Sequence, residues 1–228
     1  MRYLVVGCGG TGSHLVPPLI TYLSSHSNDW LLGLMDGDDV EEKNFDRQLF
    51  EPSALNENKA TALRKAYPHI KNIAAIPNYL SKDNIADTIQ ENSVVLICVD
   101  NFPVRALIED HCLTLDNVVV INGGNEIDTG SCQIWVRKDG VNVTPKLSFL
   151  HPEIRQPGVD RAEMSCQQIA ELPGGEQLIT TNMSSALWML IALMSFHNDT
   201  ISYTELQFNL NAPNKSYAVD QREVPGWA

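Results

Sequence analysis

The sequence has 228 residues, of which 43% are hydrophobic and 19% are charged, and its formal net charge at pH 7 is −12. A chain of this length suits one α/β domain. A surface this acidic repels phosphate backbones and anionic lipid, so neither nucleic acid nor a membrane surface is an expected partner. The longest apolar run, residues 186–194, falls well short of the roughly 20 residues that a membrane-spanning helix needs.

The chain contains five cysteines and no C-x-x-C pair. An odd number without paired spacing argues against a disulfide framework and against a structural zinc site. Met1 is followed at once by an apolar strand pattern, with no basic segment or cleavage site before it. We therefore expect a cytoplasmic protein.

The first structural signal is a glycine-rich turn between a short apolar run and a helix-like stretch. Residues 2–6 read as a strand, residues 7–13 have the sequence GCGGTGS, and residues 13–24 read as a helix that Pro17 and Pro18 shorten at its start or kink. Glycines permit a tight turn and let the N–H groups at a helix start approach an anion. This order of elements predicts a nucleotide site.

A second apolar run, residues 30–35, ends at Asp36. An acid at the end of the second strand is where dinucleotide-binding folds hold a ribose hydroxyl. The loop that follows has the sequence DGDDVEEKNFDRQ at residues 36–48. It departs from a dehydrogenase, and its carboxylates, amide and guanidinium suit an adenosine with a polyphosphate. Lys59, near the start of a helix predicted over residues 58–67, adds a point charge for phosphate.

The rest of the first half continues the alternation of strands and helices. Asp100 and Asn101 follow the most apolar strand pattern of the chain, which reads as a buried parallel strand. Because ligands of open α/β sheets collect beyond the carboxyl ends of the strands, we expect Asp100 to be placed like Asp36. The predicted strands are residues 73–76, 93–99 and 118–121, and the predicted helices are residues 82–90 and 103–115.

The second half has a different character. Residues 132–136, 205–210 and 216–219 alternate as half-buried antiparallel strands do, residues 145–173 form a long crossover, and residues 180–197 form the strongest helix pattern. We predict a Rossmann-like α/β fold, with a mostly parallel sheet extended by antiparallel strands and helices on both faces. One domain, residues 1–228, is expected, with a nucleotide-binding half (1–125) and a second half (126–228) that holds the crossover, the long helix and the terminal strands.

These motifs together resemble one protein family. GCGGTGS, MDGDDVEEKNFDRQLF, Lys59 and CVDNFPVR follow one another as in the ThiF, MoeB and HesA family, the adenylating core shared with ubiquitin-activating enzymes. The resemblance is specific over residues 1–125 and looser beyond them. Within the family the chain looks most like the PRTRC-type ThiF-related proteins of plasmid and phage gene cassettes. The resemblance implies an enzyme that uses ATP and Mg²⁺ to adenylate the C-terminal carboxylate of a ubiquitin-like or sulfur-carrier protein.

The resemblance also implies a role for individual residues. Attack of a carboxylate on the α-phosphate brings two anions together, so cations and a metal ion must neutralise that charge. Asp36 is expected to hold the ribose, and Asp100 is expected to help bind Mg²⁺. The catalytic candidates are Arg47, Lys59, Asp100 and Cys166. The nucleotide-binding candidates are Gly7, Gly9, Gly10, Gly12, Asp36, Asp38, Asn44, Arg47, Gln48, Lys59, Asp100 and Asn101, with supporting roles for Gln48 and Asn101.

Cys166 lies in the crossover, roughly where relatives that pass the activated carrier to a thiol keep their acceptor cysteine. A thiolate there would form a thioester with the carrier. A packed cysteine that begins a helix is the alternative.

Two family features are missing from the sequence. No helix precedes the first strand to carry the arginine that completes the neighbouring subunit's site in dimeric members, and the two zinc-binding C-x-x-C pairs are absent. A homodimer is still expected from the resemblance. Either this dimer works differently, or a crossover arginine such as Arg155 or Arg161 supplies the charge, or the activity is weak.

Two other functions stay open. An NAD-dependent oxidoreductase would share the glycines and Asp36, but it explains neither the N-x-x-R-Q loop nor the Asp100-Asn101 pair. A nucleotide-binding scaffold that has lost catalysis and only docks a partner protein is consistent with the missing arginine helix and zinc pairs.

Overall fold

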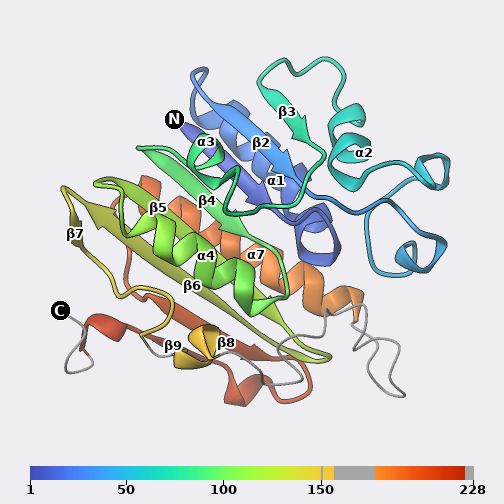
Figure 1. Cartoon of the computed structure of the whole chain (residues 1–228). Helices are drawn as coiled ribbons and strands as arrows, with labels where there is room; N and C mark the ends of the chain where they lie inside the picture. The colour runs from blue at the N-terminus through green and yellow to red at the C-terminus, as the bar shows by residue number, and fades with distance from the viewer. Residues whose placement is uncertain (150, 157–177, 224–228) are drawn as a thin grey trace.

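The structure, a computed structural model, describes residues 1–149, 151–156 and 178–223. Its centre is a nine-stranded sheet in the order β3-β2-β1-β4-β5-β6-β8-β9, with β7 paired to β6 (Figure 1). The neighbours from β3 to β5 are parallel and the remaining pairs are antiparallel, as predicted. The strands are β1 (Arg2–Val6), β2 (Leu31–Met35), β3 (Ile73–Ile76), β4 (Ser93–Ile97), β5 (Val118–Asn125), β6 (Thr129–Lys138), β7 (Val141–Asn142), β8 (Glu205–Asn209) and β9 (Tyr217–Val219).

Helices cover both faces of the sheet. One face carries α1, α2 and α7, whose apolar side chains form a core with β1, β2 and β4; α3, α4 and the short helix after β7 pack on the other face. Figure 1 shows α4 in front of the sheet and α7 behind it. The helices are α1 (Gly10–His26), α2 (Lys59–Lys65), α3 (Ile85–Thr88), α4 (Phe102–Cys112) and α7 (Ile179–His197), and the 3₁₀ helices are Glu42–Asn44, Pro52–Ala54, Pro152–Arg155, Pro213–Lys215 and Gln221–Glu223.

The first helix differs from its prediction. α1 begins at Gly10, inside the glycine turn, and continues through Pro17 and Pro18 to His26, so the expectation of a helix shortened at its start is wrong. Two prolines cost hydrogen bonds in a helix interior. They are tolerated because this helix buries Leu15 and Leu19 completely against the sheet.

The helix α3 is shorter than predicted, since only residues 85–88 of the expected 82–90 are α-helical. The long apolar helix after the crossover is confirmed almost residue for residue as α7. Among the described helices, α7 is long and apolar enough to cross a membrane by length and composition. It packs against α1, β5 and β6, and it buries Ala186, Met189 and Leu193 in the core.

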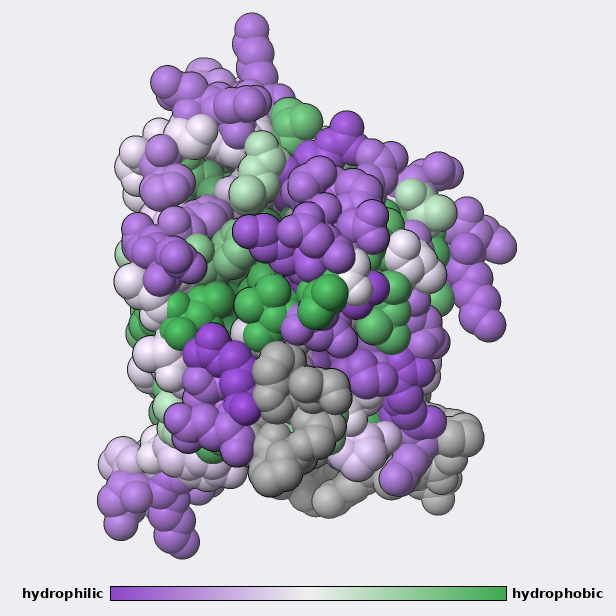
Figure 2. Space-filling view, turned by 90° about the vertical axis from the view of Figure 1, so that its left-hand side faces the viewer, coloured by the Kyte–Doolittle hydropathy of each residue, from purple (hydrophilic) through white to green (hydrophobic). Residues whose placement is uncertain are grey.

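The surface is as polar as the composition suggests. Figure 2, which views the molecule from the left-hand side of Figure 1, shows hydrophilic residues over most of this side and hydrophobic ones near its middle.

The register of the central strands prepares a site. Val6 at the end of β1 lies beside Met35 at the end of β2 and beside Ile97 at the end of β4. Three carboxyl ends are therefore level with one another. The strand order reverses direction at β1 and β4, which is where open α/β sheets bind their ligands.

Candidate active site

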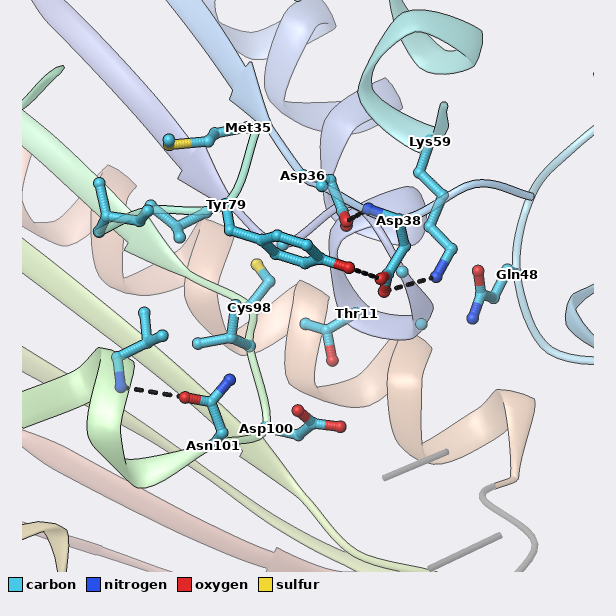
Figure 3. Close-up of a pocket in the computed structure, with 18 of the residues that line it drawn as sticks. Thr11, Met35, Asp36, Asp38, Gln48, Lys59, Tyr79, Cys98, Asp100 and Asn101 are labelled. Atoms are coloured by element: carbon cyan, nitrogen blue, oxygen red, sulfur yellow. Dashed lines mark hydrogen bonds and ion pairs between the residues drawn. The ribbon is translucent and has the colours of Figure 1, made fainter. Parts of the chain in front are cut away.

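A cavity of about 320 Å³ opens beyond these three strand ends. This volume lies at the lower end of the range for small-molecule sites. The cavity is lined by the glycine turn, by the loop after β2, by residues 78–80 after β3 and by the segment that joins β4 to α4. In Figure 3, Met35 lies at one end of the cavity and Lys59 and Gln48 lie at the other.

The glycine turn brings backbone close to backbone. Gly7 has a φ of +94°, and a Cβ there would lie 2.9 Å from the Cys98 carbonyl. A Cβ at Gly12 would lie 2.0 Å from the Gly7 carbonyl oxygen, so Gly12 sets the approach of α1 to β1. Gly9 is the N-cap of α1 and no side chain caps that helix start. The first N–H groups of α1, with the positive end of the helix dipole, are therefore suited to an anion.

Asp36 ties the glycine turn to the loop after β2. Its Oδ2 accepts a hydrogen bond from the Cys8 N–H at 2.6 Å, and its Oδ1 accepts one from the Asp38 N–H at 2.9 Å. Burial raises the pKa of the Asp36 carboxyl, and these two N–H donors offset part of the rise. Asp36 lines the cavity, as its proposed contact with a ribose requires.

Lys59, Asp38 and Tyr79 are linked in a chain at the cavity wall (Figure 3). The buried Lys59 Nζ lies 3.2 Å from Asp38 Oδ2, and the Tyr79 hydroxyl donates to Asp38 Oδ1. This hydrogen bond to a carboxylate, together with partial burial, raises the pKa of Tyr79 to about 12. The Tyr79 ring lies over Gly37, where a Cβ would be 2.5 Å from the ring. Lys59 is thus a buried cation at the cavity wall, held by one carboxylate.

Arg47 and Gln48 both line the cavity, as predicted for the N-x-x-R-Q loop. The Arg47 side chain is 9% exposed, and its Nη1 donates to the Lys43 carbonyl at 2.9 Å and to Asp46 Oδ1 at 3.1 Å. Gln48 Oε1 is buried with no hydrogen-bond partner among the described residues. An unpartnered buried acceptor at the wall of a cavity fits a ligand that donates a hydrogen bond.

Asn44 needs a correction, because it does not line the cavity. It is fully buried and caps the 3₁₀ helix Glu42–Asn44: its Oδ1 accepts the Glu41 N–H at 2.9 Å. Asn44 therefore shapes the loop that carries Arg47, and it is not among the residues that would meet a ligand in this cavity. Asn101 has a similar structural part, since its side chain accepts the Val104 N–H at 3.0 Å and caps α4.

Asp100 lies at the cavity wall at the end of the β4 segment, where the sequence predicts it. Figure 3 shows its carboxylate on the same side as Thr11 at the start of α1. The described residues contain no cluster of three or more His, Cys, Asp or Glu side chains that could hold a metal ion. Mg²⁺ usually needs only one or two carboxylates beside phosphate oxygens and water. A single carboxylate next to an anion-binding helix start fits such an ion.

The sequence analysis did not select every residue of the cavity wall, and those it missed include Tyr79, Asn125 and Asn182. Tyr79 follows β3 and Asn125 ends β5, so the carboxyl-end rule that selected Asp36 and Asp100 also selects these two positions. Asn182 comes from the first turn of α7, 135 residues beyond Arg47. Its only sequence signal is a polar residue on the buried face of an apolar helix.

Arg155, one of the two crossover arginines, is not among the residues that line this cavity. Arg155 pairs with two acids of α4: its Nε lies 3.0 Å from Glu109 Oε1 and its Nη1 lies 2.7 Å from Asp110 Oδ1. Arg161 and Cys166 lie outside the described residues.

Comparison with known sequences gives one matching family and a set of partial relatives. The ThiF family pattern matches residues 1–216. Over 132 residues the chain is 33% identical to the adenylyltransferase and sulfurtransferase UBA4 of Candida albicans, which covers 56% of this chain and 29% of that protein. Over 115 residues it is 38% identical to the adenylyltransferase and sulfurtransferase MOCS3 of Mus musculus. This match covers 48% of this chain and 24% of that protein. The chain thus spans less than a third of the length of these curated relatives.

Solved structures share the fold at low sequence identity. E. coli MccB with ATP superposes with a TM-score of 0.73 at 16% identity, over 99% of this chain and 66% of that one. PaaA superposes with a TM-score of 0.70 at 15% identity, over 96% and 63%. Since the family pattern spans residues 1–216 of the 228, this chain belongs to the ThiF family.

Proposed function

We propose that the chain activates the C-terminal carboxylate of a small ubiquitin-like or sulfur-carrier protein by ATP-dependent adenylation. The observation that carries the proposal is that the wall of the cavity has both apolar and cationic parts. Apolar side chains, among them Met35, Leu80 and Val99, line it together with the buried cations Arg47 and Lys59 and the uncapped start of α1. A flat apolar base and a chain of phosphates need these two kinds of wall in one cavity.

The chain's own residues would neutralise the phosphate charge and orient the ligand. When bound, ATP with Mg²⁺ would supply the adenylyl group and a pyrophosphate leaving group. Lys59, Arg47 and the N–H groups of α1 would take the phosphate charge, Asp36 the ribose and Asp100 the metal ion. The carrier carboxylate then attacks the α-phosphate, and these fixed charges stabilise the charge that develops in the transition state.

The relatives support ATP over a nicotinamide. The two curated relatives are named adenylyltransferases, and structures of MccB are described with ATP or with AMPCPP. Because the chain spans only part of those proteins, the reaction, the carrier and the fate of the activated carboxylate are proposals for this chain.

Pyrophosphate exchange tests the reaction. The protein is incubated with ATP, Mg²⁺ and each small protein encoded beside it, and labelled pyrophosphate is followed into ATP. Arg47→Ala and Asp100→Ala are expected to abolish exchange without unfolding. Arg2→Ala and Asp29→Ala are the matched controls, because they remove the same residue types near the amino ends of β1 and β2. Near-normal exchange in both site variants would refute this assignment of the site.

Two binding outcomes separate the alternatives. Thermal stabilisation by NAD and not by ATP with Mg²⁺ would point to an oxidoreductase. Stabilisation by ATP without exchange, even with the correct carrier, would point to a scaffold that has lost catalysis.

A second copy of the chain is the other proposed partner. The helices α1 and α7 pack side by side on one face of the sheet, and neither contains an Asp, Glu, Lys or Arg residue. On α7 the side chains of Met183 and Leu187 are 52% and 55% exposed. In a chain with a net charge of −12, this uncharged, partly apolar surface is where two copies repel each other least. A two-fold axis would set the same stripe against itself.

Sedimentation equilibrium tests the homodimer. Leu187→Glu is expected to yield monomer, whereas Leu31→Glu, at an equally exposed leucine on β2, leaves the dimer intact. A monomeric wild type would refute a dimer on this surface. Binding of the protein through α7 to neutral lipid vesicles, measured in a sedimentation assay, would refute it too.

The proposal for Cys166 is acceptance of the activated carrier as a thioester. An adduct on a gel that excess thiol cleaves, and that persists in Cys166→Ser, would remove that role. The cytoplasmic location and the lack of nucleic-acid and membrane partners stay predictions from the sequence.

A further inference from the structure

The backbone of Arg47 is anchored from two helices on the same side of the sheet. Its carbonyl oxygen accepts His14 Nε2 of α1 at 3.1 Å and Asn182 Nδ2 of α7 at 3.4 Å. His14 is 8% exposed and Asn182 is fully buried, so water does not compete with these two hydrogen bonds. Burial lowers the pKa of His14. A neutral ring with its proton on Nε2 is the form that donates to this carbonyl.

The Asn182 amide is itself fixed in orientation. Its Oδ1 accepts a hydrogen bond from Asn125 Nδ2 at the end of β5, which leaves Nδ2 as the group that faces Arg47. The same amide fills the space above Gly10, since a Cβ there would lie 2.7 Å from both its oxygen and its nitrogen. Gly10 therefore lacks a side chain for a local reason, which is to admit Asn182.

Asn182 joins the two halves of the chain at the cavity. It lines the cavity with Gly10, Arg47 and Asn125, which come from α1, from the loop after β2 and from β5. On this basis we propose that Asn182 is a positioning residue for Arg47, and that recognition of phosphate depends on how α7 is seated against the glycine turn. The inference rests on the proposed function, because it takes Arg47 as a phosphate ligand.

The guanidinium of Arg47 is less free than its position suggests. Its Nη1 is bonded to the Lys43 carbonyl and to Asp46, so both ends of the residue are held. A side chain held in this way loses little conformational entropy when it meets a phosphate. Removal of the Asn182 amide removes one of the two hydrogen bonds that hold the Arg47 carbonyl. The loss of affinity then falls on ligands that carry phosphate.

Calorimetric titration with two ligands tests the inference in the intact protein. Asn182→Ala is expected to weaken ATP binding by about three- to tenfold, the range for one buried hydrogen bond that is long at 3.4 Å. Binding of adenosine, which carries no phosphate, is expected to stay unchanged. Ser185→Ala is the matched control: Ser185 lies on the next part of α7, is also fully buried, and its hydroxyl has no partner among the described residues. The double variant with Arg47→Ala is expected to bind ATP no worse than Arg47→Ala alone.

Several results would overturn it. Equal weakening of ATP and adenosine, unchanged ATP affinity in Asn182→Ala, or additive losses in the double variant would each show that Asn182 does not act through Arg47. Asn182→Ser, which keeps a hydroxyl donor, serves if the alanine variant does not fold. In a second measurement, Asn182→Ala should restore part of the melting temperature that Gly10→Ala loses, since the added Cβ meets that amide.

The outcome is separable from that of the proposed function. If Asn182→Ala weakens ATP binding as expected but the wild type shows no pyrophosphate exchange, adenylation alone is refuted. Failure of the wild type to bind ATP would refute both.

Discussion

The pairing of Glu109 with Arg155 gives a stability prediction that can be worked through in detail. Glu109 is fully buried on α4, and its carboxylate accepts the Ser148 N–H at 2.6 Å, the Ser148 hydroxyl at 2.7 Å and Arg155 Nε at 3.0 Å. Glu109→Gln keeps the shape but removes the charge. Arg155 is 34% exposed and keeps Asp110 as a partner, but the amide sets an NH₂ group against one of the donors that face Glu109. A buried donor left without its acceptor, together with weaker hydrogen bonds to a charged group, costs about 3 kcal/mol. For a chain of this size that corresponds to a fall in melting temperature of about 6–12 °C.

Asp110→Asn is the matched control. Asp110 pairs with the same arginine at 2.7 Å, but its side chain is 61% exposed. An exposed pair contributes at most about 1 kcal/mol, so this variant should lose no more than about 4 °C. Scanning calorimetry measures both. Equal shifts in the two variants would refute the claim that burial decides the strength of these pairs.

The same pair predicts a pH dependence. Burial alone would raise the pKa of Glu109, but the hydrogen bonds from Arg155 and Ser148 outweigh it, and the net pKa is lowered. A lowered carboxyl pKa contributes stability that is complete above the unfolded value of about 4.3 and is lost as the pH falls through the folded value. The difference between wild type and Glu109→Gln should therefore be largest near neutral pH and shrink in acid. A constant difference would contradict this reasoning.

Three further predictions concern the cavity. Gly12→Ala places a Cβ 2.0 Å from a backbone oxygen, so it should lower the free energy of unfolding by about 3 kcal/mol or prevent folding; a loss under about 1 kcal/mol in a urea titration would refute the close approach. Lys59→Met should weaken ATP binding about tenfold or more by calorimetry with little change in melting temperature, because its partner Asp38 is 41% exposed; unchanged affinity would exclude a phosphate contact. Tyr79→Phe should remove one of the tyrosines that ionise near pH 12 from an ultraviolet titration, and loss of a tyrosine that ionises near pH 10 instead would show that the hydroxyl does not meet Asp38.

The sequence predicts those parts of the fold that follow from local pattern. The apolar run before Gly7 and the glycine spacing predict β1 and the turn, and the rule that ligands meet strand ends places Asp36 and Asp100 at one cavity. The paired prolines mislead, because their local cost is outweighed by the burial of Leu15 and Leu19, which only the packed sheet reveals.

The site is predicted less completely than the fold. Asn182 meets Arg47 from 135 positions away, and no local pattern contains that contact. Asn44 matches the family motif by type and position, yet its side chain caps the Glu42–Asn44 helix. Arg155 has the right charge for a phosphate and is bound instead to a buried acid. Residue type therefore indicates what a side chain is able to bind, while its partners in the fold decide what it does bind.

The buried thiols have a practical consequence for work on the fifth cysteine. Burial raises the pKa of Cys8, Cys98 and Cys132 well above the ordinary value, and it raises the pKa of Cys112 to about 12. Since the thiolate is the reactive form, these four groups stay protonated and slow to alkylate at neutral pH. Any fast reaction of the folded protein with a maleimide would thus report on Cys166, without any other cysteine having to be mutated.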